Sequence, residues 1–210
     1  MTPTRKLVLG LTMTAAAGFA DAIGFIELGG YYVSFMSGNT TQLGDALAHA
    51  AWPAALFSAF LVALFFLGSF VGSALALMHQ GRGQAYVLAL ILLSLALALI
   101  LSLLGIPAQP ALLPLAFAAG AQNAAIPTEG SARLGATFVT GTLFAAGQDL
   151  ARALSRLAPP WRWAQHLLVW ASLLLGAGLG ALTYDGFGIW ALLAPLVVYA
   201  GLLLLALRRA

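Results

Sequence analysis

The sequence contains no cysteine and very few charged residues. Of 210 residues, nine are Lys or Arg and six are Asp or Glu, so that 7% of the chain is charged and 62% is hydrophobic. Soluble domains carry about 25% charged residues, which cover the surface in contact with water. The composition therefore excludes a soluble globular enzyme and a disordered chain. The lack of cysteine excludes disulfides and thiolate metal sites.

Catalytic and metal-binding patterns are also missing. The three histidines, His49, His79 and His166, lie far apart and match no metal-ligand spacing, so that no metal or cofactor is expected. The sequence holds no catalytic triad pattern, phosphate-binding loop or carboxylate cluster, and we do not expect an enzyme. The nine basic residues are too few and too dispersed for nucleic-acid binding. The remaining class is an integral membrane protein.

Long apolar runs predict an all-α protein with about six transmembrane helices in a single membrane domain over 1–210. A helix needs about 20 apolar residues to cross roughly 30 Å of hydrocarbon. Six stretches reach or approach this length, and they are 7–26, 53–78, 85–104, 111–126, 163–182 and 189–207. The first stretch also imitates a cleavable signal peptide, but a repeat in the sequence indicates that it is retained.

The two halves of the sequence resemble one another. Three pairs of segments align, and they are 16–22 with 118–124, 34–38 with 137–141, and 68–72 with 176–180. The offsets are 102, 103 and 108, and the first of them pairs Asp21 with Asn123. We therefore predict a duplication, with repeat one over 7–104 and repeat two over 111–207. Three spans per repeat would give the halves opposite topology, as in the inverted repeats of many secondary transporters.

A polar segment in each half leaves the number of spans open. The stretch 31–50 is long enough to cross the membrane, and with its counterpart it would give eight spans in two parallel four-helix repeats. With six spans and a cytoplasmic N-terminus, all nine basic residues face the cytoplasm, whereas eight spans would place Arg82 and Arg133 outside. The positive-inside rule therefore favours six spans, cytoplasmic termini, and a re-entrant or broken polar segment in each repeat.

The polar segments form a candidate substrate site. Irregular backbone at membrane depth persists only where it is buried in protein or lines a wet cavity. Ser37, Asn39 and Thr40 are good N-cap types, and two helix starts meeting near mid-membrane would suit an anion or a polar solute. The residues expected to bind the solute are Ser34, Ser37, Gly38, Asn39, Thr40, Thr137, Thr140, Gly141, Thr142, Gln122 and Asn123. The alternative is a pair of ordinary polar turns.

Asp21 is the only charged side chain inside a predicted span. Ionisable residues in that position are costly and usually functional. Asp21 is therefore the candidate coupling site for one proton or cation, since its repeat counterpart Asn123 is neutral. The alternative role is a structural hydrogen bond between packed helices.

Two segments, Gly18–Phe25 and Phe35–Gly44, resemble the YoaK-like family of uncharacterised bacterial membrane proteins. The similarity covers essentially the whole chain, and Ser37–Thr41 is its most specific part. The resemblance implies a multi-pass protein of the bacterial plasma (inner) membrane with about six spans. It carries no assigned activity.

Two functions remain open. The first is a small secondary transporter or channel-like protein for a small polar or anionic solute, with the lipid bilayer and the solute as its partners. The second is a non-transporting scaffold or assembly partner, since glycines spaced as in 68–72 and 176–180 let helices approach closely. A bundle this thin is compatible with a homodimer. An enzyme acting on lipid would need a second catalytic acid, which the sequence does not supply.

Overall fold

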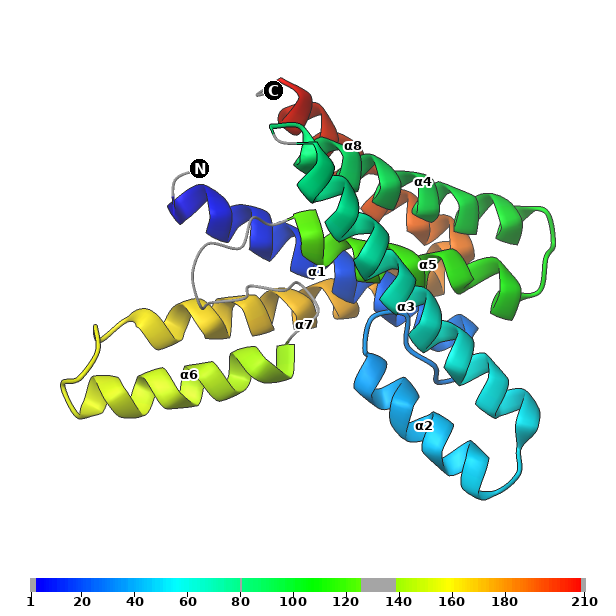
Figure 1. The fold of residues 1–210 in the computed structure, drawn as a ribbon, viewed down its shortest axis with the longest axis horizontal. Helices are drawn as coiled ribbons and strands as arrows, with labels where there is room; N and C mark the ends of the chain where they lie inside the picture. The colour runs from blue at the N-terminus through cyan, green and yellow to red at the C-terminus, as the bar shows by residue number, and fades with distance from the viewer. Residues whose placement is uncertain (1–2, 80, 126–138, 209–210) are drawn as a thin grey trace.

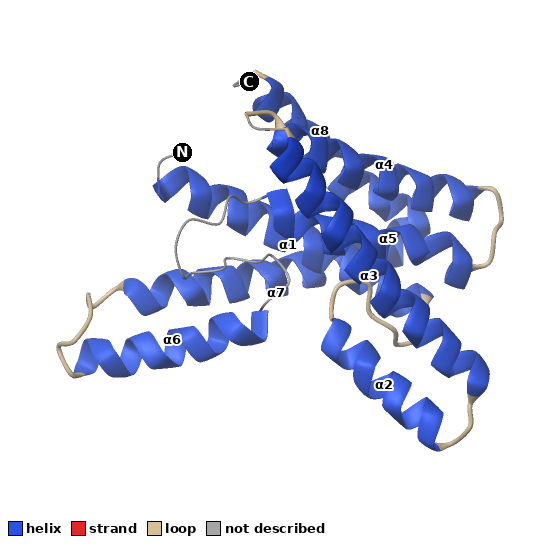
Figure 2. Ribbon diagram, in the orientation of Figure 1, coloured by secondary structure: helices blue, strands red, loops and turns tan. Residues whose placement is uncertain are grey.

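The computed structural model describes residues 3–79, 81–125 and 139–208 (Figure 1). These residues are almost entirely helical, and no strand occurs among them (Figure 2), which confirms the predicted all-α fold. In chain order the elements are α1 (Pro3–Glu27), α2 (Met36–Ala48), α3 (Trp52–Met78), α4 (Gly83–Leu103), α5 (Ala108–Gln122), the 3-10 helix η1 (Asn123–Ala125), α6 (Val139–Leu154), α7 (Arg162–Phe187), the 3-10 helix η2 (Gly188–Leu192) and α8 (Leu193–Leu207).

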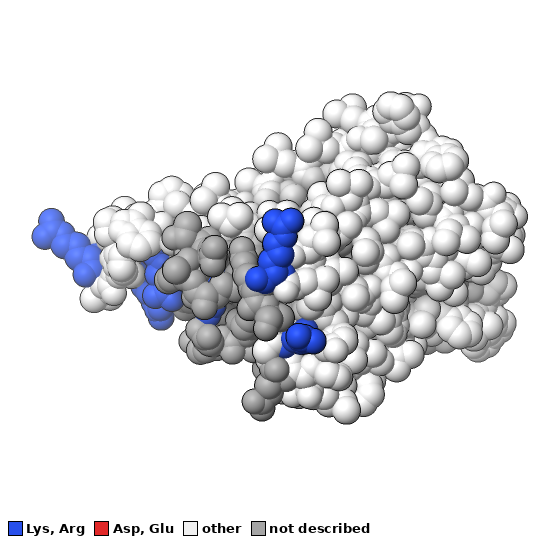
Figure 3. All heavy atoms as spheres, turned by 90° about the horizontal axis from the view of Figure 1, so that it is seen from above, with Lys and Arg blue, Asp and Glu red and all other residues white. Residues whose placement is uncertain are grey.

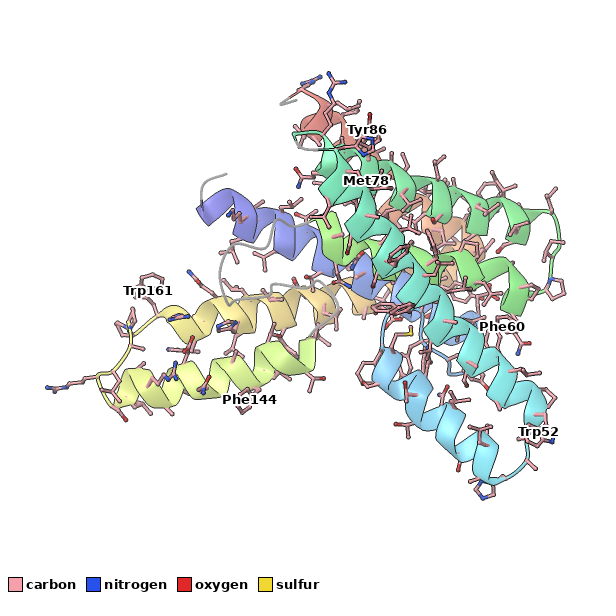
Figure 4. All side chains as sticks on the ribbon, in the orientation of Figure 1. Trp52, Phe60, Met78, Tyr86, Phe144 and Trp161 are labelled. Carbon is pink, nitrogen blue, oxygen red and sulfur yellow. The ribbon has the colours of Figure 1, made fainter. Side chains whose placement is uncertain are left out.

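Several helices have the length and composition of membrane spans. Within the part of the chain that the structure describes, four helical stretches are long and apolar enough to cross a membrane, and they are Lys6–Glu27, Trp52–Met78, Gly83–Leu103 and Arg162–Leu207. The last stretch contains both α7 and α8, because only η2 separates them. α5 has 15 residues and is continued by η1. Large apolar side chains on the outside of the bundle, such as Trp52, Phe60 and Met78 (Figure 4), are exposed as in a protein surrounded by lipid.

The long helices alternate in direction along the chain (Figure 1). Followed from blue to red, α1, α4 and α7 run toward the right of the view, and α3, α5 and α8 run toward the left. The α3–α4 and α6–α7 loops therefore lie on the same side as both termini, and the α2–α3 and α4–α5 loops lie on the other side.

The two shorter helices double back on the helices that follow them. α2 packs along the start of α3, and α6 packs along the start of α7. In Figure 1 α2 runs toward the right and α6 toward the left, so the two hairpins project to opposite sides of the bundle. The segment before α6, residues 126–138, lies outside the described residues.

Glycines bring α3 and α5 into close, parallel contact. A Cβ at Gly68 would lie 2.0 Å from the Phe117 carbonyl oxygen, and a Cβ at Gly120 would lie 2.0 Å from the Phe65 carbonyl oxygen. Side-chain carbons do not approach backbone oxygens this closely. Only glycine therefore permits this contact between backbones, which resembles the small-residue packing of transmembrane helices.

The contact between α1 and α7 has the same design. A Cβ at Gly176 would lie 2.0 Å from the Ala15 carbonyl oxygen, and a Cβ at Gly18 would lie 2.4 Å from the Leu173 carbonyl oxygen. At the end of α1 the Tyr184 hydroxyl donates a 2.8 Å hydrogen bond to Glu27 Oε1. Each of the two close contacts therefore joins a helix from one half of the chain to a helix from the other half.

Candidate functional site

Asp21 holds the irregular segment that connects α1 to α2. Its Oδ1 atom accepts hydrogen bonds from the backbone N–H groups of Val33 and Ser34, both at 2.8 Å. Val33 and Ser34 are buried, so that their N–H groups would otherwise lack a partner. The geometry matches the structural role of Asp21, in which the carboxylate replaces the hydrogen bonds that a helix would have made.

Amide side chains from α2 hold the same segment from the other side. Asn39 is 0% exposed, and its Oδ1 accepts from the Tyr32 N–H at 3.0 Å while its Nδ2 donates to the Tyr32 carbonyl at 2.6 Å. One turn further along, Gln42 Nε2 donates to the Gly30 carbonyl at 2.9 Å. With Asp21, these side chains fix the segment that leads into α2.

The start of α2 differs from the predicted capping. The helix begins at Met36, its N-cap residue is Phe35, and no side chain caps it. Asn39 therefore lies inside the helix and bonds to the preceding segment instead of to the helix N-terminus. The local sequence contains good capping residues, so that the missing cap results from tertiary contacts, in which Asn39 bonds to Tyr32.

The other predicted residues of this segment have different environments. Ser37 and Thr40 are exposed, and the Thr40 hydroxyl donates to the Met36 carbonyl at 2.8 Å. Gly38 lies against aromatic rings, since a Cβ there would lie 2.6 Å from the Phe35 ring. These residues are at the start of α2, but their described contacts are local.

The second polar segment is described only from Val139 onward, and Thr137 lies outside the described residues. Thr140 and Gly141 are exposed at the start of α6, whereas Thr142 is buried and donates to the Val139 carbonyl at 2.7 Å. The described residues of α2 and α6 do not contact each other. The two polar segments therefore do not meet directly through these helices.

A small cavity lies between α1 and α5, at the centre of the bundle. Alanines from both helices form much of its wall, namely Ala16, Ala17, Ala20, Ala118 and Ala119. Polar side chains reach it from Ser34, Gln122 and Tyr199. Its volume is about 20 Å³, which is room for about one water molecule. Two predicted site residues, Ser34 and Gln122, therefore come together here.

Gln122 and Tyr199 form a buried pair on the cavity wall. Each is 3% exposed, and the Tyr199 hydroxyl donates a hydrogen bond to Gln122 Oε1. Among the described residues, Gln122 Nε2 has no hydrogen-bond partner. A buried donor without a partner costs about 1–3 kcal/mol. Next along the chain, Asn123 is partly buried and donates to the Ala119 carbonyl at 3.3 Å.

Tyr199 was not predicted from the sequence. A tyrosine in an apolar span is usually read as an interfacial aromatic. The only sequence signal would have been the repeat, since the offset of 108 pairs Tyr199 with Ile91, which also lines the cavity.

Sequence reasoning also missed a buried ion-pair cluster between α6 and α7. Asp149 is 4% exposed, and its Oδ2 lies 3.1 Å from Arg162 Nε and 3.3 Å from His166 Nε2. The cluster fastens the α6 hairpin to α7. In the described ranges no group of three or more His, Asp or Glu side chains could hold a metal ion.

Comparison with known proteins places the chain in a family. The family model described as "Protein of unknown function (DUF1275)" matches residues 9–205. The chain is also 34% identical over 201 residues to the UPF0700 transmembrane protein RA0705 of Rhizobium meliloti (strain 1021), a match that covers 91% of this chain and 83% of that protein. No solved structure matches the chain.

These matches agree with the apolar helices and confirm the resemblance to an uncharacterised family of bacterial membrane proteins. The chain is a multi-pass membrane protein that belongs to the DUF1275 family.

Proposed function

We propose that the protein is a small secondary transporter or channel-like protein, with its solute site in the cavity between α1 and α5. The proposal rests on one observation, which is that the non-helical segment between α1 and α2 forms part of the cavity wall. Ser34 lines the cavity, and its backbone N–H is bonded to Asp21 inside a candidate span. Such irregular backbone and a buried carboxylate are expensive in a membrane and usually mark a solute path.

Inverted repeats are part of the proposal, with repeat one over 7–104 and repeat two over 111–207. Six spans fit the alternating directions of the long helices, and α2 and α6 serve as the re-entrant helices. The glycine contacts supply independent support. Shifting Gly18 and Leu173 by the repeat offsets of 102 and 108 gives the second contact, in which Gly120 meets Phe65.

The close contacts divide the bundle in a way that suits alternating access. α1, α6 and α7 form one packed group, and α2, α3 and α5 form another. The groups meet where α1 faces α5 across the cavity. Small motions of one group against the other would open the cavity to either side, as in other transporters built from repeats.

The charge distribution supports cytoplasmic termini in the inner membrane of a bacterium. On the face shown in Figure 3, Lys and Arg side chains lie at the left and in the middle of the view, and the right-hand part shows none. The described basic residues belong to the termini and to the α3–α4 and α6–α7 regions, and they are Arg5, Lys6, Arg82, Arg152, Arg156, Arg162 and Arg208. Loops rich in Lys and Arg stay in the cytoplasm.

The main support for a scaffold function was the glycine spacing of two spans. In the structure these glycines pack against helices of the same chain, so that this support is lost. Gly68 and Gly72 contact α5, and Gly176 and Gly180 contact α1. The glycines therefore explain internal packing without a partner protein.

Uptake by reconstituted protein tests the proposal. Purified protein in liposomes should take up at least one of four radiolabelled or fluorescently detected probes, namely acetamide, glycerol, acetate and nitrate, faster than protein-free liposomes do. Asp21→Asn should abolish the uptake, because it removes the only charged side chain within the predicted span 7–26, whereas the exposed Asp45→Asn should not. Uptake of none of the probes would refute transport, and uptake unchanged by Asp21→Asn would refute the coupling role.

A further inference from the structure

We infer that the transported solute is a small neutral molecule with one oxygen acceptor and an apolar end, such as an amide or an alcohol, and that Gln122 selects it. The inference rests on the proposed function and concerns the same cavity. The proposed function leaves open whether the solute is neutral or an anion, and the inference selects a neutral one.

The hydrogen-bonding groups of the cavity define what its ligand must offer. The Tyr199 hydroxyl donates to Gln122 Oε1, so that the acceptor side of the amide is occupied. The Nε2 group has no partner among the described residues, although Gln122 is buried. The cavity therefore presents an unpaired donor, and a ligand with an acceptor oxygen would satisfy it.

The charges around the cavity exclude an anion. Among the described residues that line it, none is Lys or Arg. The Asp21 carboxylate accepts hydrogen bonds from the backbone of Val33 and Ser34, two residues of the cavity wall. A buried anion without a cation, and beside a carboxylate, is strongly disfavoured.

The remaining wall accommodates an apolar group. Gln122 corresponds to Ala20 in the first half of the chain, and Tyr199 corresponds to Ile91. All four residues line the cavity, so that this polar pair belongs to the second half of the chain and apolar residues occupy the equivalent positions of the first half, which also supplies the polar Ser34. The cavity has room for about one water molecule, so that α1 and α5 must move apart to admit even a solute of a few heavy atoms.

Acetamide and acetate form a suitable pair of probes, because they share shape and size and differ in charge. Protein-dependent uptake of radiolabelled acetamide into liposomes should exceed that of acetate at least about tenfold. Gln122→Leu should lower acetamide uptake about tenfold, which corresponds to one lost hydrogen bond. Gln148→Leu, at an exposed position on α6, is the matched control and should leave uptake unchanged.

A second variant addresses the orientation of the amide. Tyr199→Phe frees Gln122 Oε1, so that the amide presents both a donor and an acceptor. Acetamide can then accept from Nε2 and donate to Oε1, whereas acetate has no donor, and the preference for acetamide over acetate should rise. Size-exclusion profiles in detergent establish that each variant is folded. Acetate uptake equal to acetamide uptake, or acetamide uptake that Gln122→Leu leaves intact, would overturn the inference while transport stands. Uptake of neither probe would overturn the inference and count against transport as well.

Discussion

Replacing Asp21 by alanine should destabilise the fold severely, because one carboxylate oxygen serves two buried backbone groups. Oδ1 accepts from the N–H groups of Val33 and Ser34 at 2.8 Å each, and among the described residues neither group has another acceptor. An unpaired buried N–H costs about 1–3 kcal/mol. Asp21→Ala should therefore lower the free energy of unfolding by about 4 kcal/mol.

Asp21→Asn separates the hydrogen bonds from the charge. The amide oxygen of asparagine can still accept from the same N–H groups, but hydrogen bonds to a neutral acceptor are about half as strong as those to a charged one. The loss should therefore be about 2 kcal/mol. Asp45→Ala is the control, since the Asp45 side chain is 75% exposed and pairs only with His49 in the same helix.

Thermal unfolding of the purified protein in detergent, followed by tryptophan fluorescence, measures these differences. For a chain of this size each kcal/mol corresponds to about 2–4 °C in Tm. We expect Tm to fall by roughly 10 °C for Asp21→Ala and by about half as much for Asp21→Asn. If Asp21→Ala is as stable as Asp45→Ala, the hydrogen bonds to the segment before α2 do not hold that segment, and this account of Asp21 is wrong.

Two further predictions concern packing and topology. Gly176→Ala should lower Tm by several degrees, because its Cβ would lie 2.0 Å from the Ala15 carbonyl oxygen. The control is Gly178→Ala, whose Cβ meets nothing within 4 Å and which should stabilise α7 by up to about 1 kcal/mol. Equal effects of the two substitutions on Tm would contradict the contact between α1 and α7. Because the chain has no cysteine, single-cysteine variants report topology. With six spans, Ile106→Cys should react with a membrane-impermeant maleimide from outside intact cells and Ser155→Cys only after lysis; with eight spans, both would need lysis.

Much of the helical framework could be predicted from hydropathy alone. The predicted span 53–78 agrees with α3, and the predicted span 163–182 falls within α7. Long apolar runs determine helices locally, because in lipid every backbone group must find its partner within the helix. The polar stretch 31–50, which contains α2, could also be identified, since its composition breaks the apolar pattern.

The contacts between helices could not be predicted in the same way. The pairing of α1 with α7, and of α3 with α5, depends on which small residues face one another after the chain has folded. Asp149 illustrates the limit for polar residues. In the sequence it belongs to an amphipathic helix that could lie on the membrane surface, and only the packing of α6 on α7 buries it beside Arg162 and His166.

Asn39 shows how the fold can use a side chain otherwise than its local sequence predicts. Its side chain suits a helix N-cap, and the sequence places it near a helix start. In the structure the helix begins earlier, and the same amide bonds to both backbone groups of Tyr32. The choice between these partners depends on the path of the segment before α2, which the position of Asp21 on α1 determines.

The differences between the two halves determine how a solute could sit in the cavity. A cavity built from two equivalent halves would present the same groups to both ends of a ligand. Here Gln122 and Tyr199 are polar, whereas the equivalent residues Ala20 and Ile91 are apolar. An unequal cavity favours a single bound orientation, with the acceptor oxygen at the Gln122 amide and the apolar end toward Ala20. A solute with two distinct ends, such as acetamide, meets that requirement, whereas a symmetric anion such as nitrate has no apolar end to place there.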